Sequence, residues 1–191
     1  MKCGVLAIQG AVSEHIETLK KILDFEKKGS VVIVRKKENL EKIDALIIPG
    51  GESTTISKLI VKNDLYSDIK KRGEEGMPIM GTCAGAIILS KKVDDERVKN
   101  LDLIDIETQR NAFGRQFDSF EAPVKIEGFD KAFPAVFIRA PLITDVWGSA
   151  EILSRIDNRI IMVKQDNLFA LSFHPELTND LRIHEYFLDF V

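Results

Sequence analysis

Four short apolar runs in the first eighty residues constrain the fold most strongly. They cover residues 2–8, 31–34, 45–48 and 78–80. Runs this short, apolar at consecutive positions and rich in β-branched residues, are typical of strands buried on both faces of a parallel sheet. Apolar residues with helical spacing follow the first and third runs, and they predict helices over residues 14–25, 56–60 and 65–72. Strands that alternate with helices predict an α/β fold, with a mostly parallel central sheet and helices on both faces.

The second half of the chain is less regular. Unequal strands are expected over residues 101–109, 119–126, 135–138, 160–164 and 168–173. A last helix should follow, capped by Thr178 or Asn179, as Ser13 is expected to cap the first one. We find no internal repeat and no linker, so the 191 residues are expected to form one domain, residues 1–191.

Charge and cysteine content exclude several classes of partner and site. The net charge of −3 is spread over interleaved lysines and acids, which argues against nucleic acid or an anionic membrane as a partner. No apolar run approaches the roughly 20 residues that cross a bilayer. Two cysteines, Cys3 and Cys83, form neither a disulfide framework nor a metal cluster, and both fit a reducing, cytoplasmic setting. We expect no metal and no cofactor.

Cys83 lies in the sequence Gly81-Thr82-Cys83-Ala84-Gly85, between an apolar run and a helix-like run. A strand, a tight turn flanked by glycines and a helix make the setting of a nucleophile elbow, here with cysteine in place of serine. The N-terminal end of the helix would favour the thiolate. On this local spacing alone, a buried cysteine beside a glycine-rich turn fits equally well.

A cysteine nucleophile needs a base and a group that orients the base. His174 directly follows an apolar strand and precedes Pro175, which blocks continuation of the strand. In an extended backbone Glu176 points the same way as His174 and can hold its tautomer. The order Cys83, His174, Glu176 makes catalysis the better interpretation, although a structural strand-end histidine has the same local sequence.

Acyl chemistry also needs donors for an oxyanion. The backbone N–H of Ala84 follows the nucleophile, and the turn Pro49-Gly50-Gly51, at the end of another strand, can supply a second N–H, predicted at Gly51. Arg110 and Arg139 each follow an apolar stretch and could grip a charged substrate. By spacing alone, each fits a solvated surface arginine better.

Taken together, these segments closely resemble the glutaminase subunits of pyridoxal 5′-phosphate synthase, which are class I (triad-type) glutamine amidotransferases. The matching segments follow the family's order over nearly the whole chain: GVLAIQGAV with Glu14-His15, PGGESTT from Pro49, GTCAG from Gly81, RNAFGRQ from Arg110, FIRAP from Phe137 and SFHPELT from Ser172. The cysteine elbow and His-Pro-Glu are shared by many amidotransferases, whereas the QGAV, RNAFGRQ and IRAP segments are more particular to this family.

The resemblance implies a three-layer, flavodoxin-like fold and a mechanism. Cys83 would attack the side-chain amide of glutamine, His174 would carry the proton to the leaving ammonia, and Glu176 would orient His174. A glutamyl thioester would form and water would hydrolyse it to glutamate. Glutamine would be bound by a set of six residues: Gly51, Glu52, Ser53, Arg110, Ile138 and Arg139.

The resemblance also implies a partner. Ammonia would pass to a separate synthase subunit, which makes pyridoxal 5′-phosphate from ribose 5-phosphate and glyceraldehyde 3-phosphate, within a large hetero-oligomer. The segment that begins at Gln9 and Gly10 and continues to Glu14 and His15 would contact this subunit, so His15 is predicted to be an interface residue rather than a catalytic one. Family members complete their oxyanion hole only on docking, so the isolated chain should be nearly inactive.

Two alternatives remain open at this point. The first is a glutaminase that feeds another synthase, or a hydrolase of γ-glutamyl compounds, and only the Arg110 and Arg139 segments argue against it. The second is a non-catalytic binding protein on the same fold, which the complete set of Cys83, His174 and Glu176 disfavours. One departure from the family is Asp166 where members often carry glycine. Aspartate tolerates the left-handed turn conformation, so this affects no catalytic residue.

Overall fold

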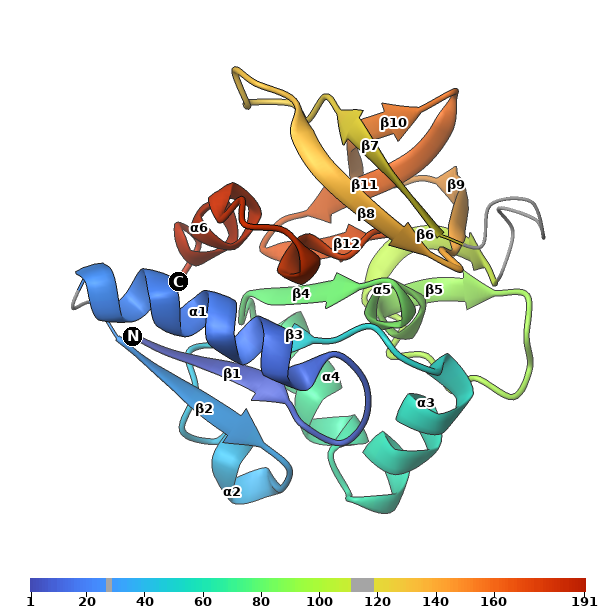
Figure 1. The fold of residues 1–191 in the computed structure, drawn as a ribbon. Coiled ribbons are helices and arrows are strands. Elements are labelled where there is room, and N and C mark those ends of the chain that lie inside the picture. Colours follow the sequence, from blue (N-terminus) through green and yellow to red (C-terminus); the bar gives the residue numbers. More distant parts are fainter. Residues whose placement is uncertain (27–28, 111–118) are drawn as a thin grey trace.

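The computed structural model describes residues 1–26, 29–110 and 119–191. Its centre is a ten-stranded sheet with the order β2-β1-β3-β4-β12-β11-β9-β6-β5, in which β10 also pairs with β11, and β7 and β8 form a separate hairpin (Figure 1). The strands are β1 (Lys2–Leu6), β2 (Ser30–Val34), β3 (Ala45–Ile48), β4 (Ile79–Thr82), β5 (Ser90–Val93), β6 (Ile104–Gln109), β7 (Ser119–Val124), β8 (Phe133–Ile138), β9 (Leu142–Val146), β10 (Glu151–Ile156), β11 (Arg159–Gln165) and β12 (Leu168–Leu171).

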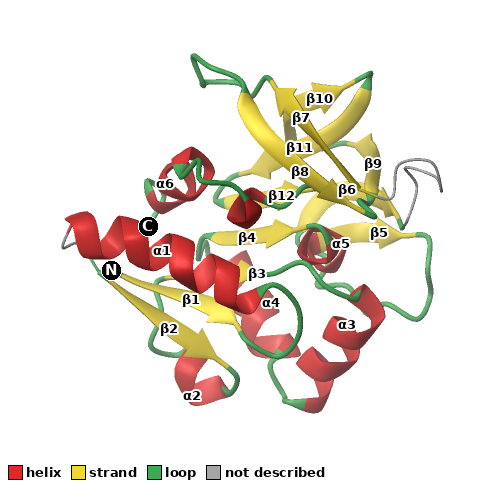
Figure 2. Cartoon of the chain, viewed as in Figure 1, coloured by secondary structure: helices red, strands yellow, loops and turns green. Residues whose placement is uncertain are grey.

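Helices cover both faces of the sheet (Figure 2). They are α1 (Val12–Glu26), α2 (Lys37–Leu40), α3 (Ser53–Lys62), α4 (Tyr66–Glu74), α5 (Ala84–Leu89), the 3₁₀ turn η2 (Pro175–Leu177) and α6 (Arg182–Leu188). Helices α1 and α6 pack on one face together with the β7–β8 hairpin, and α2 to α5 pack on the other. The three-layer architecture predicted from the sequence is confirmed.

Strand β3 shows why apolar residues occupy every position of the central strands. Ala45 and Ile47 join the core under α1 and α6, whereas Leu46 and Ile48 join the core under α3, α4 and α5. Successive side chains of a strand point to opposite faces, so a strand covered on both sides needs an unbroken apolar run. Each fully buried Leu or Ile contributes about 1.5–3 kcal/mol of transfer free energy.

The sheet is parallel from β2 to β12 and mixed beyond it. Strands β1, β2, β3, β4 and β12 run parallel, which brings the carboxyl ends of β3, β4 and β12 to one edge. Strand β11 is antiparallel to β12, β9 and β10, and β9 is antiparallel to β6. Open α/β sheets place their sites at the carboxyl ends of parallel strands, so the edge that β3, β4 and β12 share is where a site is expected.

Several details differ from the prediction. Helix α1 begins at Val12, so Ser13 lies inside its first turn instead of capping it, and its hydroxyl donates to Glu14 Oε2 at 2.9 Å. Helix α6 begins at Arg182, beyond Thr178 and Asn179, neither of which caps it. Strands β5, β9 and β10 and the one-turn helix α2 had no clear signal, because they are short or carry charges on their exposed face.

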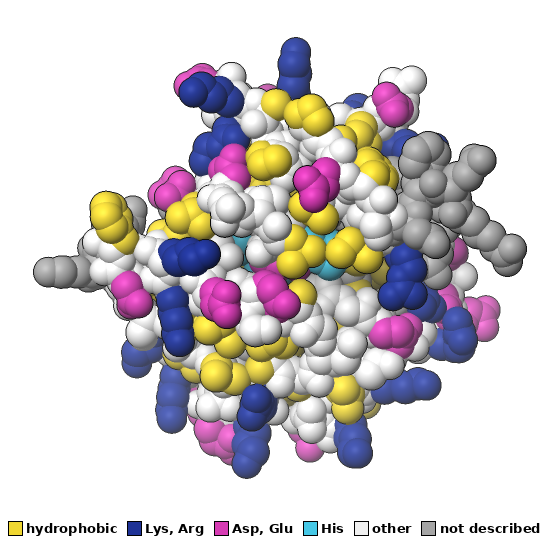
Figure 3. All heavy atoms as spheres, viewed as in Figure 1, with side chains coloured by type: hydrophobic (Ala, Val, Ile, Leu, Met, Phe, Trp, Pro, Cys, Tyr) yellow, Lys and Arg dark blue, Asp and Glu magenta, His cyan; other side chains and the backbone are white. Residues whose placement is uncertain are grey.

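Two surface properties bear on function. Lysines and arginines interleave with acidic side chains over the face seen in Figure 3, without a large area of one sign. Among the described residues, no helix is long and apolar enough to cross a membrane.

Candidate active site

Cys83 lies at the junction of β4 and α5 with a strained backbone. Its φ of 50° and ψ of −107° fall in a region that residues with a side chain rarely adopt. The Cys83 N–H donates to Leu171 O at 2.7 Å, which ties the junction to the end of β12. A strained residue between a strand and a helix has the backbone geometry of a nucleophile elbow, so the predicted strand–turn–helix setting of Cys83 is confirmed.

The two glycines of the elbow are needed for close approach of the backbone. A Cβ on Gly81 would lie 2.4 Å from Gly85 O, and a Cβ on Gly85 would lie 2.1 Å from Ile48 O. The positive φ falls on Cys83 itself and on neither glycine. The glycines therefore let α5 pack directly onto β3 and β4, and Cys83 takes the strain.

His174 reaches the same place from β12. Leu171 in β12 pairs in parallel with Thr82 in β4, so the residues just after the two strands lie at one edge of the sheet. The backbone N–H of His174 donates to Val136 O at 2.8 Å, and its Nδ1 lies 2.7 Å from Glu176 Oε1. Glu176 is buried inside the short η2 turn that begins at Pro175. The structure therefore brings Glu176 to His174, although through a 3₁₀ turn and not through the extended backbone on which the sequence prediction rested.

The protonation of His174 follows from these neighbours. Burial opposes the charged form, but the hydrogen bonds and the charges of Cys83 and Glu176 outweigh it and raise the pKa of His174 to about 10. The histidine is therefore an imidazolium at neutral pH in this arrangement. Contact with Cys83 contributes to this shift, so His174 is placed to exchange a proton beside the cysteine.

Gly50 shows how closely Cys83 and His174 approach. A Cβ on Gly50 would lie 2.4 Å from His174 Cε1 and 3.2 Å from Cys83 Cβ. The turn after β3 therefore packs directly on both residues. Gly50 was not singled out from the sequence as a site residue, although its Pro-Gly-Gly context was the available signal.

A cavity of about 360 Å³ opens between these elements. It contains all six residues predicted to bind glutamine, the two predicted to hold the oxyanion, and the reactive side chains. Its lining residues are Gln9, Gly10, Ala11, Gly50, Gly51, Glu52, Ser53, Cys83, Ala84, Ile87, Arg110, Ile138, Arg139, Pro141 and His174. Ala11, Ile87 and Pro141 were not predicted as site residues, and packing of their separate segments brings them to the cavity.

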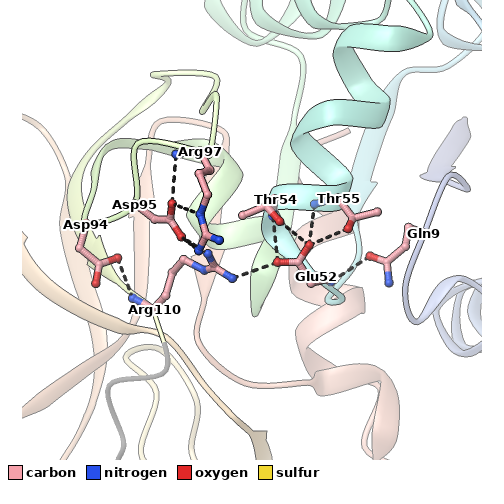
Figure 4. Close-up of polar contacts among 8 residues, drawn as sticks. All are labelled: Gln9, Glu52, Thr54, Thr55, Asp94, Asp95, Arg97 and Arg110. Atoms are coloured by element: carbon pink, nitrogen blue, oxygen red, sulfur yellow. Dashed lines mark hydrogen bonds and ion pairs between the residues drawn. The ribbon is translucent and has the colours of Figure 1, made fainter.

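The charged end of the cavity is formed by Glu52 and Arg110 (Figure 4). Glu52 accepts hydrogen bonds from the backbone N–H groups and the hydroxyls of Thr54 and Thr55 at the start of α3. Partial burial opposes its ionisation, but these bonds lower the pKa of Glu52 to about 2. Arg110 Nη2 donates to Glu52 Oε1 at 2.9 Å.

Arg110 is held from its other side by Asp95, which the sequence analysis did not single out. Asp95 forms ion pairs with Arg110 Nη1 and with Arg97 Nη2, and Asp94 Oδ1 accepts the backbone N–H of Arg110 at 3.0 Å (Figure 4). The hydrogen bonds from Arg97, followed by the contact with Arg110, hold the pKa of Asp95 well below its usual range. No local sequence pattern links residues 95 and 110. The remainder of the RNAFGRQ segment, residues 111–116, lies outside the described residues.

The remaining predicted site residues flank the sulfur. Cys83 Sγ lies 3.8 Å from Ile138 O, so the end of β8 lies beside the sulfur. Arg139 follows with a positive φ of 43°, a second strained backbone at the site.

The turn after β3 is held by two hydrogen bonds of the Gly50 backbone. Gly50 N–H donates to Thr82 Oγ1 at 3.1 Å, and Gly50 O accepts from Ala11 N–H at 3.0 Å, which fixes the peptide group before Gly51.

The four residues predicted to contact a partner differ in exposure. Gly10 is exposed, and Gln9 and Glu14 are partly buried. The contact of His15 with a partner remains a prediction, and the structure shows that its side chain is 0% exposed and lies behind the triad. The helical pattern of α1 did not show this, because burial of the polar face depends on α6 and η2 packing against it.

Comparisons with known proteins agree with this geometry. The family model described as the SNO glutamine amidotransferase family matches residues 5–191. The chain is 52% identical, over 98% of each chain, to the pyridoxal 5′-phosphate synthase subunit PdxT of Thermococcus gammatolerans, and 51% identical to that of Thermoplasma acidophilum, over 100% of this chain and 93% of the relative. A solved structure described as a glutamine amidotransferase superposes with a TM-score of 0.91 at 44% identity, covering 98% of this chain and 97% of the other. This chain, with its cysteine elbow and the histidine–glutamate pair in one cavity, therefore belongs to the SNO glutamine amidotransferase family.

Proposed function

We propose that this chain is the glutaminase subunit of a pyridoxal 5′-phosphate synthase. It hydrolyses L-glutamine to L-glutamate and passes the ammonia to a synthase subunit. The observation that carries the proposal is the single cavity in which Cys83 and His174 meet the six residues predicted to bind glutamine. The PdxT relatives, at about half identity over the full chain, support the choice of acceptor.

The reaction follows from the protonation of the site. The Cys83 thiolate attacks the side-chain carbonyl carbon of glutamine, and the oxygen takes up negative charge beside the N–H groups of Ala84 and Gly51. The C–N bond breaks as His174 gives its proton to the leaving nitrogen, which departs as ammonia. A glutamyl thioester remains on Cys83, and His174 is now neutral and able to act as a base.

Water completes the cycle. His174 takes a proton from a water molecule as its oxygen attacks the thioester carbonyl, and the thiolate leaves. Glutamate is released, and the Cys83 thiolate and the His174 imidazolium are restored. Glu176 stabilises the imidazolium each time it forms, because its Oε1 lies 2.7 Å from Nδ1.

Recognition of glutamine is assigned to the charged end of the cavity. The ionised carboxylate of Glu52 suits the α-ammonium group of glutamine, and Arg110 or Arg139 suits its α-carboxylate. Arg110 already contacts Glu52 and Asp95, so it is held in one orientation before substrate arrives. Such preorganisation lowers the entropic cost of binding.

The ammonia acceptor is proposed to be a synthase subunit that builds pyridoxal 5′-phosphate from ribose 5-phosphate and glyceraldehyde 3-phosphate, within a hetero-oligomer in the cytoplasm. Gln9, Gly10 and Glu14, at the mouth of the cavity and the start of α1, are the proposed contact residues. Gln9 Oε1 also accepts the backbone N–H of Glu52 at 2.9 Å, so a partner that moves Gln9 would reach the substrate-binding turn.

The proposal is tested by combining the chain with a synthase subunit, glutamine and the two sugar phosphates, and by following the pyridoxal 5′-phosphate chromophore and glutamate. Both products are expected with the native chain and neither with Cys83→Ala. Cys3→Ala is the matched control, because Cys3 is buried in β1 away from the cavity, and burial raises its pKa to about 12. Glutamate release by Cys83→Ala would refute the mechanism, and glutamate without the chromophore would refute the acceptor.

A further inference from the structure

A pair of buried histidines lies directly behind the triad. His15 of α1 and His184 of α6 are both 0% exposed, and His15 Nδ1 lies 3.0 Å from His184 Nε2. The other ring nitrogen of His15, Nε2, lies 3.1 Å from Thr82 Oγ1 and 3.3 Å from Glu176 Oε2. The proposed mechanism uses neither histidine, yet the chain contains only three histidines and all of them belong to this one cluster.

Both histidines are neutral at physiological pH. Burial, with the positive charge of His174 adding to it, holds the pKa of His15 well below its usual value, and burial lowers the pKa of His184 to about 3. Each neutral ring carries one N–H and one bare nitrogen, so each is either a donor or an acceptor at a given atom. The positions of these two protons decide whether His15 Nε2 presents a hydrogen-bond donor or a lone pair to Glu176.

The surroundings favour one of the two arrangements. His184 Nδ1 and Glu176 Oε2 are both buried without a hydrogen-bond partner in the described part of the chain. If His15 carried its proton on Nδ1, His184 would bury an N–H with no acceptor, and the bare Nε2 of His15 would face a carboxylate oxygen. Both contacts are costly, because an unsatisfied buried donor or charged oxygen loses its full solvation.

The opposite arrangement lowers both costs, because it buries no N–H without an acceptor and places a donor, not a lone pair, beside the carboxylate. His184 then donates from Nε2 to His15 Nδ1, and its own Nδ1 is a bare acceptor. His15 carries its proton on Nε2, where the N–H lies between Thr82 Oγ1 and Glu176 Oε2. The second oxygen of the triad carboxylate then has a donor within reach, while Oε1 remains for His174.

We propose that His15 is a positioning residue of this site. Its Nε2–H stabilises the second carboxylate oxygen of Glu176, and His184 fixes the tautomer of His15 that places the proton on Nε2. The chain of contacts runs from His184 through His15 and Glu176 to His174 and Cys83. The inference rests on the proposed function only in taking Glu176 as the residue that orients His174.

The contact of His15 with Thr82 links His15 to the turn Pro49-Gly50-Gly51, which carries a predicted oxyanion donor. Thr82 Oγ1 accepts the backbone N–H of Gly50 as well as lying beside His15 Nε2. His15 therefore adjoins both the carboxylate that orients the base and the turn that carries Gly51. It sits one turn into α1, immediately after the segment proposed to contact the synthase.

The tautomers can be measured on the native chain. Labelling the three histidines with ¹⁵N and recording long-range ¹H–¹⁵N spectra near pH 7 distinguishes protonated from bare ring nitrogens. We expect His15 and His184 to be neutral with the proton on Nε2, and His174 to be doubly protonated. A proton on Nδ1 of His15, or a charged His15, would overturn the proposal without any variant being made.

Variants then test the consequence for the triad. His15→Phe keeps the ring but removes the donor, whereas His15→Gln restores one donor and one acceptor. With the synthase present, His15→Phe should lower kcat at least tenfold with little change in KM, and it should lower the pH midpoint of His174 by about one unit. His15→Gln should recover most of both values, and His184→Leu should raise the fraction of His15 that carries its proton on Nδ1.

These outcomes separate the inference from the proposed function. A His15→Phe chain that folds and keeps the native kcat and His174 midpoint would refute the role of His15, whatever the substrate. If Cys83→Ala remained active, the proposed function would fail, but the tautomers and the midpoint would still report on His15 and Glu176. Equal losses in His15→Phe and His15→Gln would indicate packing rather than hydrogen bonding, and would also refute the proposal.

Discussion

Arg110 Nη2 lies 2.9 Å from Glu52 Oε1, so two residues that line the cavity form an ion pair. Glu52 comes from the start of α3 and Arg110 directly follows β6, and the pair joins two elements that are far apart in the sequence. The pair presents one charge of each sign to a substrate that carries one of each. Its geometry leads to the first prediction.

Replacing Arg110 by glutamine should weaken glutamine binding more than it slows the chemical steps. Loss of one charge-assisted hydrogen bond costs about 1.5–3 kcal/mol, so KM should rise by about ten- to a hundredfold. Steady-state glutaminase kinetics with the synthase present measure this. Arg97→Gln is the control, because Arg97 contacts Asp95 from the outside, and its KM should change by less than about threefold. A change confined to kcat would contradict a binding role.

Gly50→Ala should inactivate the chain without unfolding it. The new Cβ would lie 2.4 Å from His174 Cε1 and 3.2 Å from Cys83 Cβ, so both reactive groups must move. Displacements of this size cost about a hundredfold or more in rate. Gly76→Asn is the control for backbone strain without a clash, because its positive φ strains any side chain while nothing lies within 4 Å of the added Cβ, and it should keep near-native turnover. Near-native turnover in Gly50→Ala would show that the turn is not packed on the reactive groups.

Removing the sulfur should lower the proton affinity of His174. Burial opposes the charge of His174, whereas Cys83 and Glu176 favour it and raise its pKa to about 10. In Cys83→Ala only Glu176 remains as a favourable partner, so the pH midpoint of the His174 resonances should fall. Titration of ¹⁵N-histidine spectra provides the measurement. An unchanged midpoint would mean that Cys83 does not contribute to the raised pKa of His174.

The same shift gives His174 a defined effect on stability. A group whose folded pKa is raised from 6.5 to about 10 contributes fully below pH 6.5, and this contribution is lost as the pH rises toward 10. Urea unfolding between pH 7 and pH 10 should therefore show the native chain losing stability relative to His174→Gln. A constant difference between the two chains over this range would contradict the raised pKa.

Acid should destabilise the chain through the two neutral histidines. His15 and His184 have lowered pKa values in the folded chain, whereas the unfolded chain binds a proton at each near pH 6.5. The unfolded state therefore binds more protons, and the free energy of unfolding should fall by about 1.4 kcal/mol per pH unit for each histidine below pH 6.5. His174 adds no slope there, because it is protonated in both states.

Urea unfolding between pH 4.5 and pH 7 checks this value, and His184→Asn supplies the comparison. The variant titrates one proton fewer in the unfolded state, so its slope should be smaller by about 1.4 kcal/mol per pH unit. Parallel curves for the two chains would show that His184 is charged in the folded protein.

Much of the fold was predictable because its signals are local. The unbroken apolar run of β3 requires cover on both faces of the sheet, and the order of strands and helices requires a mostly parallel arrangement. Strand β5 escaped notice because it lies at the sheet edge, and its Lys91 and Lys92 are exposed and give no apolar pattern. The starts of α1 and α6 were misplaced because their capping residues gave no distinctive signal.

The site residues also divide into those that local sequence predicts and those that depend on distant partners. Cys83, His174 and Glu176 were identified because an elbow and a strand-end histidine are patterns of a few consecutive residues. Asp95 and the buried position of His15 were not, because each depends on partners from distant segments: Arg110 for the first, and Glu176 with His184 for the second.

The sequence by itself determined the alternation of strands and helices, the strand–turn–helix context of Cys83 and the spacing of His174 and Glu176, because these depend on neighbours along the chain. Only the tertiary structure decided that His15 turns inward to Glu176 and that Asp95 holds Arg110 against Glu52. Contacts of this kind form when separate elements pack, and burial then fixes which side chains must share protons and charge. Local sequence is enough to predict the elbow, whereas the contacts of His15 and Asp95 with the other site residues arise only from packing.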